Sequence, residues 1–465
     1  MSHTAKPQPS KRFQVPRACD RCKSLRRGCS ETRPCRRCVK AGLSQQCLSS
    51  MPGPVRPAPS VPFREWEDAL RKLNDLVQDM AIIDYCADRF FERLHPTIPI
   101  LTRTYVEELK SESLTAAGAE ARCTLAAMCS QVLIQTEDPA GVFHQSIFPE
   151  KNGGYGRHLF ENTLLSYRCL PRQSNPTVNH CLTAFFLYAC QVRLSHHSQA
   201  FVFLREVTTL LTLLRVSETE TIAKGIADRL FWVALISERS HAIRYSRPTT
   251  LQITLDTPGF ETGDSSLDGF WALVGLFRPI DTTVVALLNR ELFAEEPSRE
   301  LLNRVETAVN AAIKTSVSLL DTQKANLRIT QLWLRVIIWQ LRLRLGYLTD
   351  ESYQHSLTYQ YPLLIAKDLV LSTRDLPIES IRVHGVGITE KLFDIASAVI
   401  DVLARIPLRD TANRGMSLDA PPEEDLLYVR HIVRQLPDGH EIYDNLLEKH
   451  IQQALPQFTS STESR

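Results

Sequence analysis

Six cysteines lie within 29 residues near the start of this 465-residue chain. Their spacing gives two Cys-x2-Cys pairs, and each pair is followed by a single further cysteine. A Cys-x2-Cys pair lets two thiolates face one ion across a tight turn, and structural zinc takes four tetrahedral ligands. Six thiolates serve two such ions only if two sulfurs are shared. The spacing therefore predicts a two-zinc cluster with the ligands Cys19, Cys22, Cys29, Cys35, Cys38 and Cys47.

The other cysteines show no ligand spacing, so we expect them to be small buried hydrophobes. They are Cys86, Cys123, Cys129, Cys169, Cys181 and Cys190. In a reducing compartment, closely spaced cysteines are typical of metal sites and not of disulfides. No apolar segment near Met1 resembles a signal peptide. The longest apolar region, 329–348, is interrupted by three arginines that a membrane would have to bury, and we expect no membrane span.

Charge is distributed very unevenly along the chain. Residues 1–47 contain twelve Lys or Arg against Asp20 and Glu31, a formal charge of +10. Because the whole chain carries +2, the remainder carries −8. A concentrated basic block attracts a polyanion, whereas an acidic body does not. The sequence therefore predicts that nucleic acid binds at the cysteine-rich end.

The cysteine motif resembles that of a known family. It reads Ala-Cys-Asp-Arg-Cys-Lys-Ser-Leu-Arg-Arg-Gly-Cys over 18–29, then Pro-Cys-Arg-Arg-Cys over 34–38, and ends at Cys47. This resembles the signature of the fungal zinc binuclear-cluster transcription factors. The resemblance implies that Cys19 and Cys35 bridge two zinc ions, one completed by Cys22 and Cys29 and the other by Cys38 and Cys47. A ferredoxin-type iron–sulfur site would need Cys-x2-Cys-x2-Cys, which is absent.

The same resemblance implies double-stranded DNA as the partner. In the family a short helix after the second cysteine enters the major groove, often over a CGG-type triplet, where basic side chains reach guanine acceptors. Lys23 and Arg26 match the family's basic positions, whereas Leu25 and Gly28 stand where many members have a basic residue. We expect Arg26 to contact a base and Lys23 a base or a phosphate. The expected phosphate contacts are Arg21, Arg27, Arg36 and Lys40, with solvated surface charge as the alternative for each.

The sequence around the cluster predicts a tail, a linker and a helix. Residues 1–16 form a basic disordered arm, which either serves nuclear import or phosphate contact or merely solubilises the chain. The cluster module spans 17–47, and five prolines make 48–62 an extended linker of roughly 45 Å. Apolar residues at a/d spacing over 63–80 fit a short coiled coil that would make a homodimer. An amphipathic helix packed on its own domain fits them equally well.

Residues 82–410 are expected to form a large all-α domain. Glycine is sparse, and apolar residues recur at intervals of three and four residues, as in Ile388, Leu392, Ile395 and Val399. Trp333 and Trp339 mark an expected buried helix. Four stretches resemble the family's middle homology regulatory region, and they are 90–101, 200–206, 229–232 and 247–248. That resemblance implies a regulatory domain that recruits coactivators or other transcription machinery and could bind a small-molecule inducer.

Two further segments carry alternative interpretations. The run Gly-Gly-Tyr-Gly-Arg-His over 153–158 is expected to be a turn before a helix, because it lacks the ending of a phosphate-binding loop. Residues 411–465 are expected to form a C-terminal tail. Its acidic and apolar residues from Pro421 onward fit either a weak activation segment or an ordinary exposed helix.

These observations favour a nuclear, sequence-specific regulator of transcription over other classes of protein. The fold class is mostly α, with a small N-terminal zinc module, a proline-rich linker and a large helical regulatory domain. The resemblance to the family favours an activator that reads a GC-rich, CGG-like site. Its targets would be metabolic genes, either for sugar utilisation or in a biosynthetic gene cluster. The alternatives are an RNA-binding or chromatin adaptor and an enzyme with an appended zinc module. Common catalytic motifs are absent from the sequence, so no residues support an enzyme.

Overall fold

The computed structural model divides the chain into two compact units, Met1–Glu65 and Trp66–Arg465. Each unit is described by itself. The described residues of the first unit are 19, 22, 24–25, 29, 34–43 and 47. Those of the second unit are 71, 73, 80–136, 152–172, 175–217, 219–259, 265–291, 298–314, 318–405 and 421–455.

The small unit is organised around its cysteines. It contains helix α2 (Arg36–Lys40), and its buried cluster consists of Cys19, Cys22, Cys35, Cys38 and Cys47, with Cys29 packed against them. In the described part of this unit, thiols occupy the place that aliphatic side chains fill in a larger domain. A segment this short cannot bury enough apolar surface to be stable, so it needs another source of folding energy.

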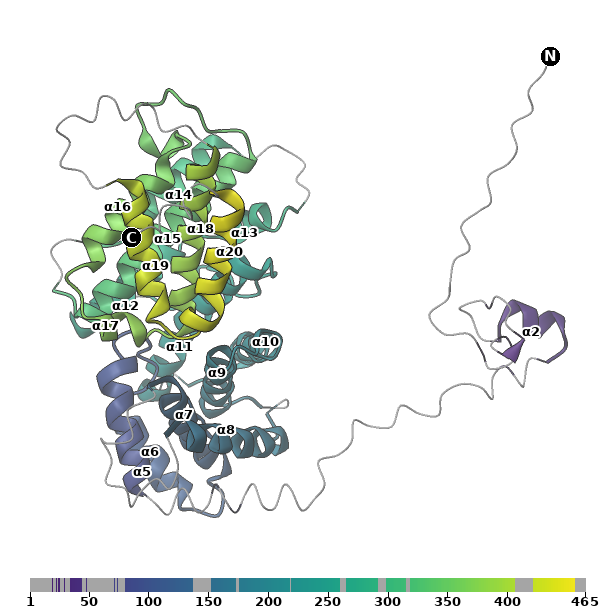
Figure 1. The fold of residues 1–465 in the computed structure, drawn as a ribbon. Coiled ribbons are helices and arrows are strands. Elements are labelled where there is room, and N and C mark those ends of the chain that lie inside the picture. The colour runs from purple at the N-terminus through teal and green to yellow at the C-terminus, as the bar shows by residue number, and fades with distance from the viewer. Residues whose placement is uncertain are drawn as a thin grey trace. The chain divides into compact units, whose positions relative to one another are not determined.

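The large unit is helical, as the sequence predicts, and its described residues contain no strand (Figure 1). Its first half comprises α5 (Met80–Arg89), α6 (Arg103–Ser113), α7 (Ala119–Thr136), α8 (Asn152–Cys169), α9 (Val178–Arg193), α10 (His197–Leu213) and α11 (Thr221–Tyr245). Its second half comprises α12 (Asp268–Phe277), α13 (Thr282–Leu288), α14 (Arg299–Ala311), α15 (Asp321–Arg344), α16 (Tyr361–Thr373), α17 (Ile378–Arg382), α18 (Val386–Arg405), α19 (Pro422–Arg434) and α20 (Asp444–Ala454). Short π-helical or 3-10 segments cover Phe90–Leu94, Ser265–Leu267, His355–Leu357 and Gly439–Tyr443.

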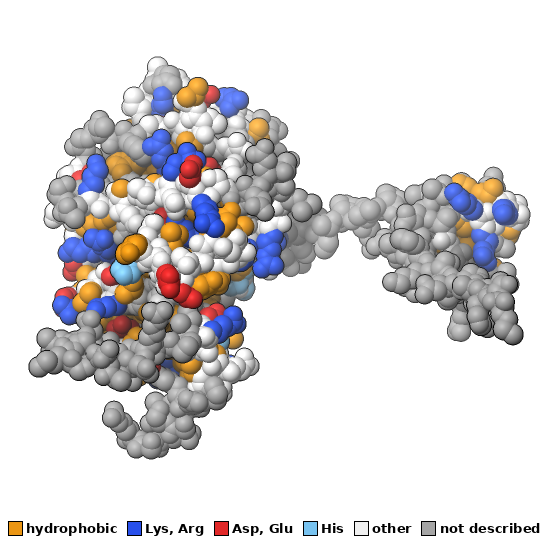
Figure 2. All heavy atoms as spheres, turned by 90° about the horizontal axis from the view of Figure 1, so that it is seen from above, with side chains coloured by type: hydrophobic (Ala, Val, Ile, Leu, Met, Phe, Trp, Pro, Cys, Tyr) orange, Lys and Arg blue, Asp and Glu red, His pale blue; other side chains and the backbone are white. Residues whose placement is uncertain are grey.

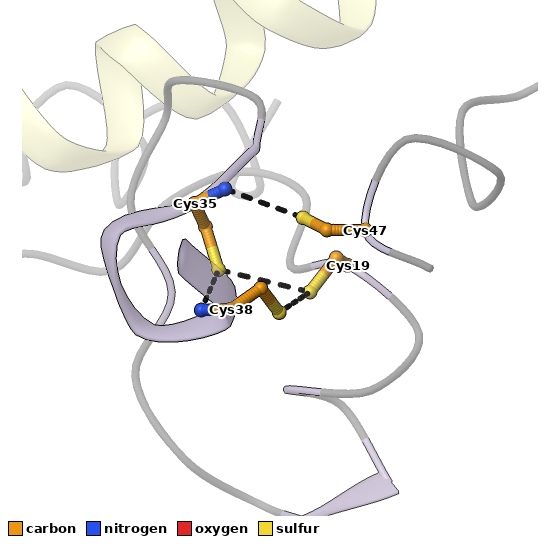
Figure 3. Close-up of side chains that lie close together, drawn as sticks. All are labelled: Cys19, Cys35, Cys38 and Cys47. Atoms are coloured by element: carbon orange, nitrogen blue, oxygen red, sulfur yellow. Dashed lines mark hydrogen bonds between the residues drawn. The ribbon is translucent and has the colours of Figure 1, made fainter. Parts of the chain in front are cut away.

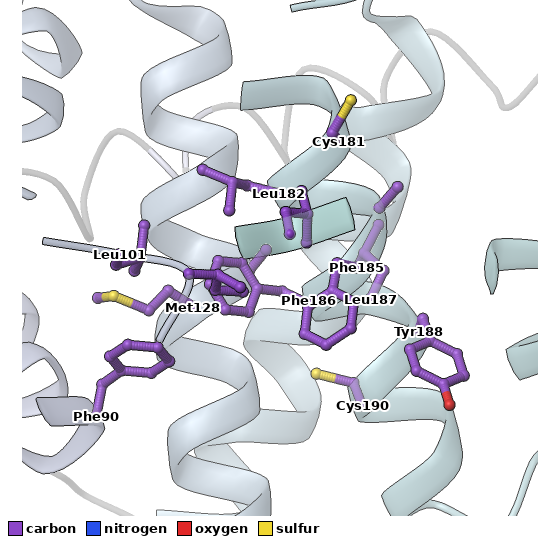
Figure 4. Close-up of a cluster of buried hydrophobic side chains, with 14 of the residues drawn as sticks. Phe90, Leu101, Met128, Cys181, Leu182, Phe185, Phe186, Leu187, Tyr188 and Cys190 are labelled. Atoms are coloured by element: carbon purple, nitrogen blue, oxygen red, sulfur yellow. The ribbon is translucent and has the colours of Figure 1, made fainter. Parts of the chain in front are cut away.

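Two hydrophobic clusters hold the large unit together. The first gathers side chains from α5 to α12, and it includes Phe186 of α9, whose ring meets that of Phe90 edge to face at 6.1 Å (Figure 4). The second gathers side chains from α12 to α20 around α15 and α18. Helix α11 joins them, because Leu230 packs in the first cluster and Ala242 in the second.

The helical periodicity in the sequence identified the centre of the second cluster. Trp333 and Trp339 are both buried on α15, and the stripe from Ile388 to Val399 is buried on α18. Helix α15 also buries Arg342, whose guanidinium lies 2.8 Å from Glu306 on α14. Of the six cysteines outside the cluster motif, five are buried as expected, whereas Cys169 at the end of α8 is exposed.

The four stretches that resemble the middle homology region contact each other in pairs. Arg229 on α11 donates to the carbonyl oxygen of Pro99 at 2.6 Å. Arg205 on α10 donates to Glu238 at 2.8 Å and to the carbonyl oxygen of Pro248 at 3.3 Å. These bonds fix loops against helices within the first half of the unit, which is a structural role for the resembling residues.

Hydrogen bonds also join segments that lie far apart in the sequence. Gln135 on α7 donates to the carbonyl oxygen of Val383 at 2.9 Å, across 248 positions. Ser195 donates to Asp438 at 2.6 Å, and Gln323 donates to the carbonyl oxygen of Pro96 at 3.2 Å. The two halves of the unit are therefore bonded to each other as well as packed.

The predicted helix over 63–80 falls mostly outside the described residues. Within it, Leu73 is helical, and its side chain is buried in the first hydrophobic cluster. A leucine buried in its own domain agrees with the amphipathic alternative at that position. The coiled coil and the homodimer remain predictions.

The C-terminal helices differ from the expected tail. Leu426, Val429 and Val433 on α19 and Leu447 and Ile451 on α20 are buried in the second cluster. Their spacing of three and four places them on one face of each helix, and this face packs on the helical body. The helical body therefore includes 421–455, and an activation role for this segment remains a prediction.

The glycine-rich run also differs from the expected turn, because Gly153, Gly154 and Gly156 lie inside α8. A Cβ added at Gly156 would lie 2.8 Å from Cβ of Leu133 and 3.1 Å from Cγ1 of Ile134, both on α7. The missing side chain at Gly156 thus allows α8 to approach α7 closely.

We expect Gly156→Ala to lower the free energy of unfolding by about 1–3 kcal/mol, because the added methyl overpacks the α7–α8 contact. Chemical denaturation monitored by far-ultraviolet circular dichroism measures it. Gly387→Ala on α18 is the matched control, because a Cβ there meets nothing within 4 Å. Equal stability of the two variants would contradict the close-packing role.

Among the described helices, no single one is long and apolar enough to cross a membrane. One bent pair, Ser265–Phe277 with Thr282–Leu288, passes that test on length and composition.

Candidate metal centre and nucleic-acid interface

The six sulfurs of the small unit gather into two groups of four that share two members. Cys19, Cys22, Cys29 and Cys35 form one group, and Cys19, Cys35, Cys38 and Cys47 form the other. Within each group all sulfurs lie within 4.8 Å of one another, and either group could hold a metal ion. Figure 3 shows the second group, in which the sulfurs of Cys19, Cys35 and Cys38 turn toward one another.

The distances between neighbouring sulfurs fit metal ligands and exclude disulfides. Sγ of Cys19 lies 4.0 Å from Sγ of Cys35 and 3.8 Å from Sγ of Cys38, and Sγ of Cys22 lies 3.7 Å from Sγ of Cys35. A disulfide would place two sulfurs about 2.05 Å apart. Four sulfurs held tetrahedrally at about 2.3 Å from zinc are about 3.8 Å from each other. The thiols therefore fit a tetrahedral metal such as zinc.

Local backbone structure aims the cysteines of the second pair. Cys35 is the N-cap of α2, and its sulfur accepts a hydrogen bond from the amide of Cys38 at 3.4 Å. The amide of Cys35 in turn donates to Sγ of Cys47 at 3.3 Å. Gly42 closes the turn after α2 with φ of +69°, which a residue with a Cβ rarely adopts. The chain can then return toward Cys47.

The electrostatics of these thiols favour a bound cation. The amide N–H of Cys38 lowers the pKa of Cys35 to about 5, which favours its thiolate. Burial raises the pKa of Cys22, because removal from water disfavours the charged thiolate, and hydrogen bonds with the neighbouring thiols raise it further. A divalent ion reverses that preference by pairing with all the sulfurs at once, since a coordinating thiol is deprotonated. The donor set is thus suited to a bound cation.

The residues expected to contact DNA are only partly described. Arg36 and Lys40 lie on α2 with exposed side chains, and Cys38 is buried on the same helix. Lys and Arg side chains are visible on the described part of the small unit (Figure 2). Arg21, Lys23, Arg26 and Arg27 lie outside the described residues. Leu25 lies among them in sequence, and its side chain is 48% exposed.

Sequence reasoning missed one feature of the large unit. Lys391 on α18 lies beside a cavity of about 190 Å³ that is walled by both hydrophobic clusters. The signal was present in the sequence, because position 391 follows Ile388 by three and precedes Ile395 by four. A lysine thus occupies the apolar face of the helix.

Comparison with known proteins finds distant relatives along most of the chain, although no family model matches it. The probable sucrose utilization protein SUC1 of Candida albicans is 22% identical over 353 residues, covering 70% of this chain and 67% of the relative. The maltose fermentation regulatory protein MAL13 of Saccharomyces cerevisiae is 20% identical over 418 residues, covering 83% and 84%. The respiratory transcription factor ZNF1 of the same yeast is 22% identical over 343 residues, covering 70% of each chain. These fungal relatives, two of them named as a regulatory protein or a transcription factor, confirm the resemblance to the fungal zinc-cluster regulators.

Proposed function

We propose that this protein is a DNA-binding regulator of transcription in sugar metabolism. The observation that carries the proposal is the pair of four-sulfur groups sharing Cys19 and Cys35, next to exposed basic residues on α2. The relatives named for maltose or sucrose utilisation point to the metabolic process. The protein would act in the nucleus, where its DNA lies. It would act by binding DNA and not as an enzyme.

The metal would be two zinc ions. One would be held by Cys19, Cys22, Cys29 and Cys35, and the other by Cys19, Cys35, Cys38 and Cys47. Zinc bound in this way supplies the folding energy that the small unit lacks. The cysteines fix the direction of α2 through the capping bond at Cys35 and thereby orient the basic side chains that face DNA.

The DNA contacts follow from charge and from the family's docking geometry. Arg26 would read a guanine, Lys23 a guanine or a phosphate, and Arg36 and Lys40 the phosphates. Arg21 and Arg27 complete the phosphate contacts. The preferred site would be GC-rich and CGG-like, and Leu25 and Gly28 mark the positions where preference departs from that of related proteins.

Regulation would reside in the large unit, which would recruit coactivators or other transcription machinery. We favour an activator. A homodimer formed through 63–80 would set the spacing of two half-sites. Selection of bound sites from random duplex DNA tests triplet, spacing and symmetry together, and footprinting with and without a chelator tests the role of the metal. Preference for single-stranded RNA, or duplex binding that ignores salt and chelator, would overturn the proposal.

We expect two basic positions to differ in how they contribute to binding. Arg26→Ala should weaken binding to the selected duplex by about tenfold to a hundredfold and relax guanine preference, because a base contact discriminates by about 1–3 kcal/mol. Lys40→Ala should weaken binding to all duplexes alike. The slope of the logarithm of the binding constant against the logarithm of the salt concentration should become smaller by about one, because one phosphate contact is lost. Titration of labelled duplexes at several salt concentrations measures both effects.

Lys449→Ala is the matched control for these variants, because that lysine is exposed on α20 of the large unit. Its affinity for DNA should equal that of the unmodified protein. If the Arg26→Ala protein kept its preference for guanine, Arg26 would not be the residue that reads the base.

A further inference from the structure

A cavity of about 190 Å³ lies within the large unit, where the two hydrophobic clusters meet. Most of its wall is apolar, as at Phe185 on α9, Val233 on α11 and Phe277 on α12. An engineered apolar cavity of about 150 Å³ is enough to bind benzene. The space therefore suits a molecule with a body of about six to ten heavy atoms.

The polar part of the wall contains two basic side chains and no acidic one among the described residues. Lys391 and Arg93 line the cavity together with His384, whose pKa burial lowers to about 4, and with amide and hydroxyl side chains. A ligand with a negative charge would meet no repelling side chain in this lining. The charge of the wall selects for anions over cations.

Lys391 is a charged group of this wall that lacks a carboxylate partner among the described residues. Its ammonium donates to Oγ1 of Thr330 at 2.8 Å and lies 5.4 Å from the ring centre of Trp333. Across the described residues, no carboxylate forms an ion pair with it, although Arg244 nearby holds both Glu390 and Asp394. Burial lowers the pKa of Lys391 to about 7, since an ammonium without a counterion is unfavourable inside a protein. A lysine has three donors, so hydrogen-bonding capacity remains.

A second, larger cleft adjoins the cavity. Its volume is about 770 Å³, and it shares the lining residues Arg93, Gln135 and Val383 with the cavity. This cleft is lined by further arginines, Arg193 and Arg382, alongside Glu92 and Glu379. Arg93 therefore lines both spaces, and its positive charge favours an anion in either of them.

We propose that this cavity binds a small organic anion, with a carboxylate on Lys391 and an apolar body against Phe185, Val233 and Phe277. The anion supplies the counterion that the protein does not, and its apolar part fills space between the two halves of the unit. Because the halves are joined at this cavity, a bound anion stabilises their packing. The proposal is independent of DNA binding, because it is measured on the protein alone.

Benzoate and benzyl alcohol are suitable probes, since they differ chiefly in charge. Calorimetric titration of the full-length protein should show benzoate binding at least tenfold more tightly than benzyl alcohol. In Lys391→Met that preference should disappear, because the amine is lost and the length of the side chain is kept. Equal affinity of the two probes for the unmodified protein, or an unchanged benzoate preference in Lys391→Met, would overturn the proposal.

A second variant tests the charge without removing the lysine. Thr330 donates to Oδ1 of Asn326 at 3.2 Å and accepts from Lys391, so the three side chains form one hydrogen-bonded chain. Asn326→Asp keeps the shape and adds an internal counterion, which should lower benzoate affinity at least tenfold. Lys324→Met, on the half-exposed Lys324 of the same helix, should leave it unchanged. Full benzoate affinity in a folded Asn326→Asp protein would also overturn the proposal.

Discussion

Cys35→Ala is expected to abolish specific binding to duplex DNA, with a loss of more than a hundredfold, and to reduce bound zinc from two ions to none. Cys35 is a member of both sulfur groups and is the N-cap of α2, so its removal takes a ligand from each site and a cap from the helix. Structural zinc contributes about 10–16 kcal/mol of apparent binding free energy in small metal-dependent domains. Few other contacts in the described part of the small unit can replace it.

Elemental analysis of the purified protein measures the zinc, and gel-shift titration measures the DNA. The large unit should keep its helical circular dichroism, since its two clusters contain none of these cysteines. Cys169→Ala removes an exposed thiol at the end of α8 and should change neither zinc nor DNA binding. A Cys35→Ala protein that still held two zinc ions and bound DNA would disprove the shared-ligand arrangement.

Glu306→Ala should lower the free energy of unfolding of the large unit by about 3–5 kcal/mol, because it leaves the buried guanidinium of Arg342 without its carboxylate partner. Arg342 is 1% exposed, and its guanidinium bonds Glu306 at 2.8 Å and Asn303 at 2.7 Å. The hydroxyl of Tyr361 donates to the same carboxylate at 3.1 Å, and burial raises its pKa to about 12. Denaturant titration followed by tryptophan fluorescence measures the loss, since Trp333 and Trp339 lie on the same helix as Arg342.

A matched control and a double variant make this prediction specific. Asp88→Ala breaks the pair with Arg103, in which both side chains are more than 60% exposed, and should cost less than about 1 kcal/mol. Glu306→Leu combined with Arg342→Met should recover most of the stability, because apolar side chains then replace both charges. A single variant as stable as Asp88→Ala would show that Arg342 finds another partner.

The sequence predicted the features that depend on local pattern. Cysteine spacing identified the residues that the structure gathers into two groups, and periodicity identified the buried faces of α15 and α18. Such patterns are readable because turn geometry and helical pitch are set by neighbouring residues. The choice of zinc and the DNA contacts remain predictions, since they rest on chemistry and resemblance.

The features that sequence reasoning misjudged depend on which elements meet. Glycines usually mark turns, but Gly156 lies inside α8 because α7 packs closely against that position. The acidic start of α19 suggested a C-terminal tail with an exposed helix or an activation segment, yet the apolar face of α19 packs in the second cluster. Lys391 is on an apolar face, but only the packing of several helices around it creates a cavity. Tertiary contacts of this kind cannot be read from one segment at a time.

The bonds that join distant segments have a consequence for how the protein is made. Gln135 is synthesised before its partner Val383, and Ser195 before its partner Asp438. The ribosome must therefore add more than two hundred residues before either hydrogen bond can form. During that interval the apolar side chains of α9 that later line the cavity with α18, such as Phe185, are uncovered, and such nascent surfaces attract chaperones. Synthesis of the last helices, and not of the first, completes the large unit. A premature stop shortly before Asp438 would therefore leave an aggregation-prone product and no shortened regulator.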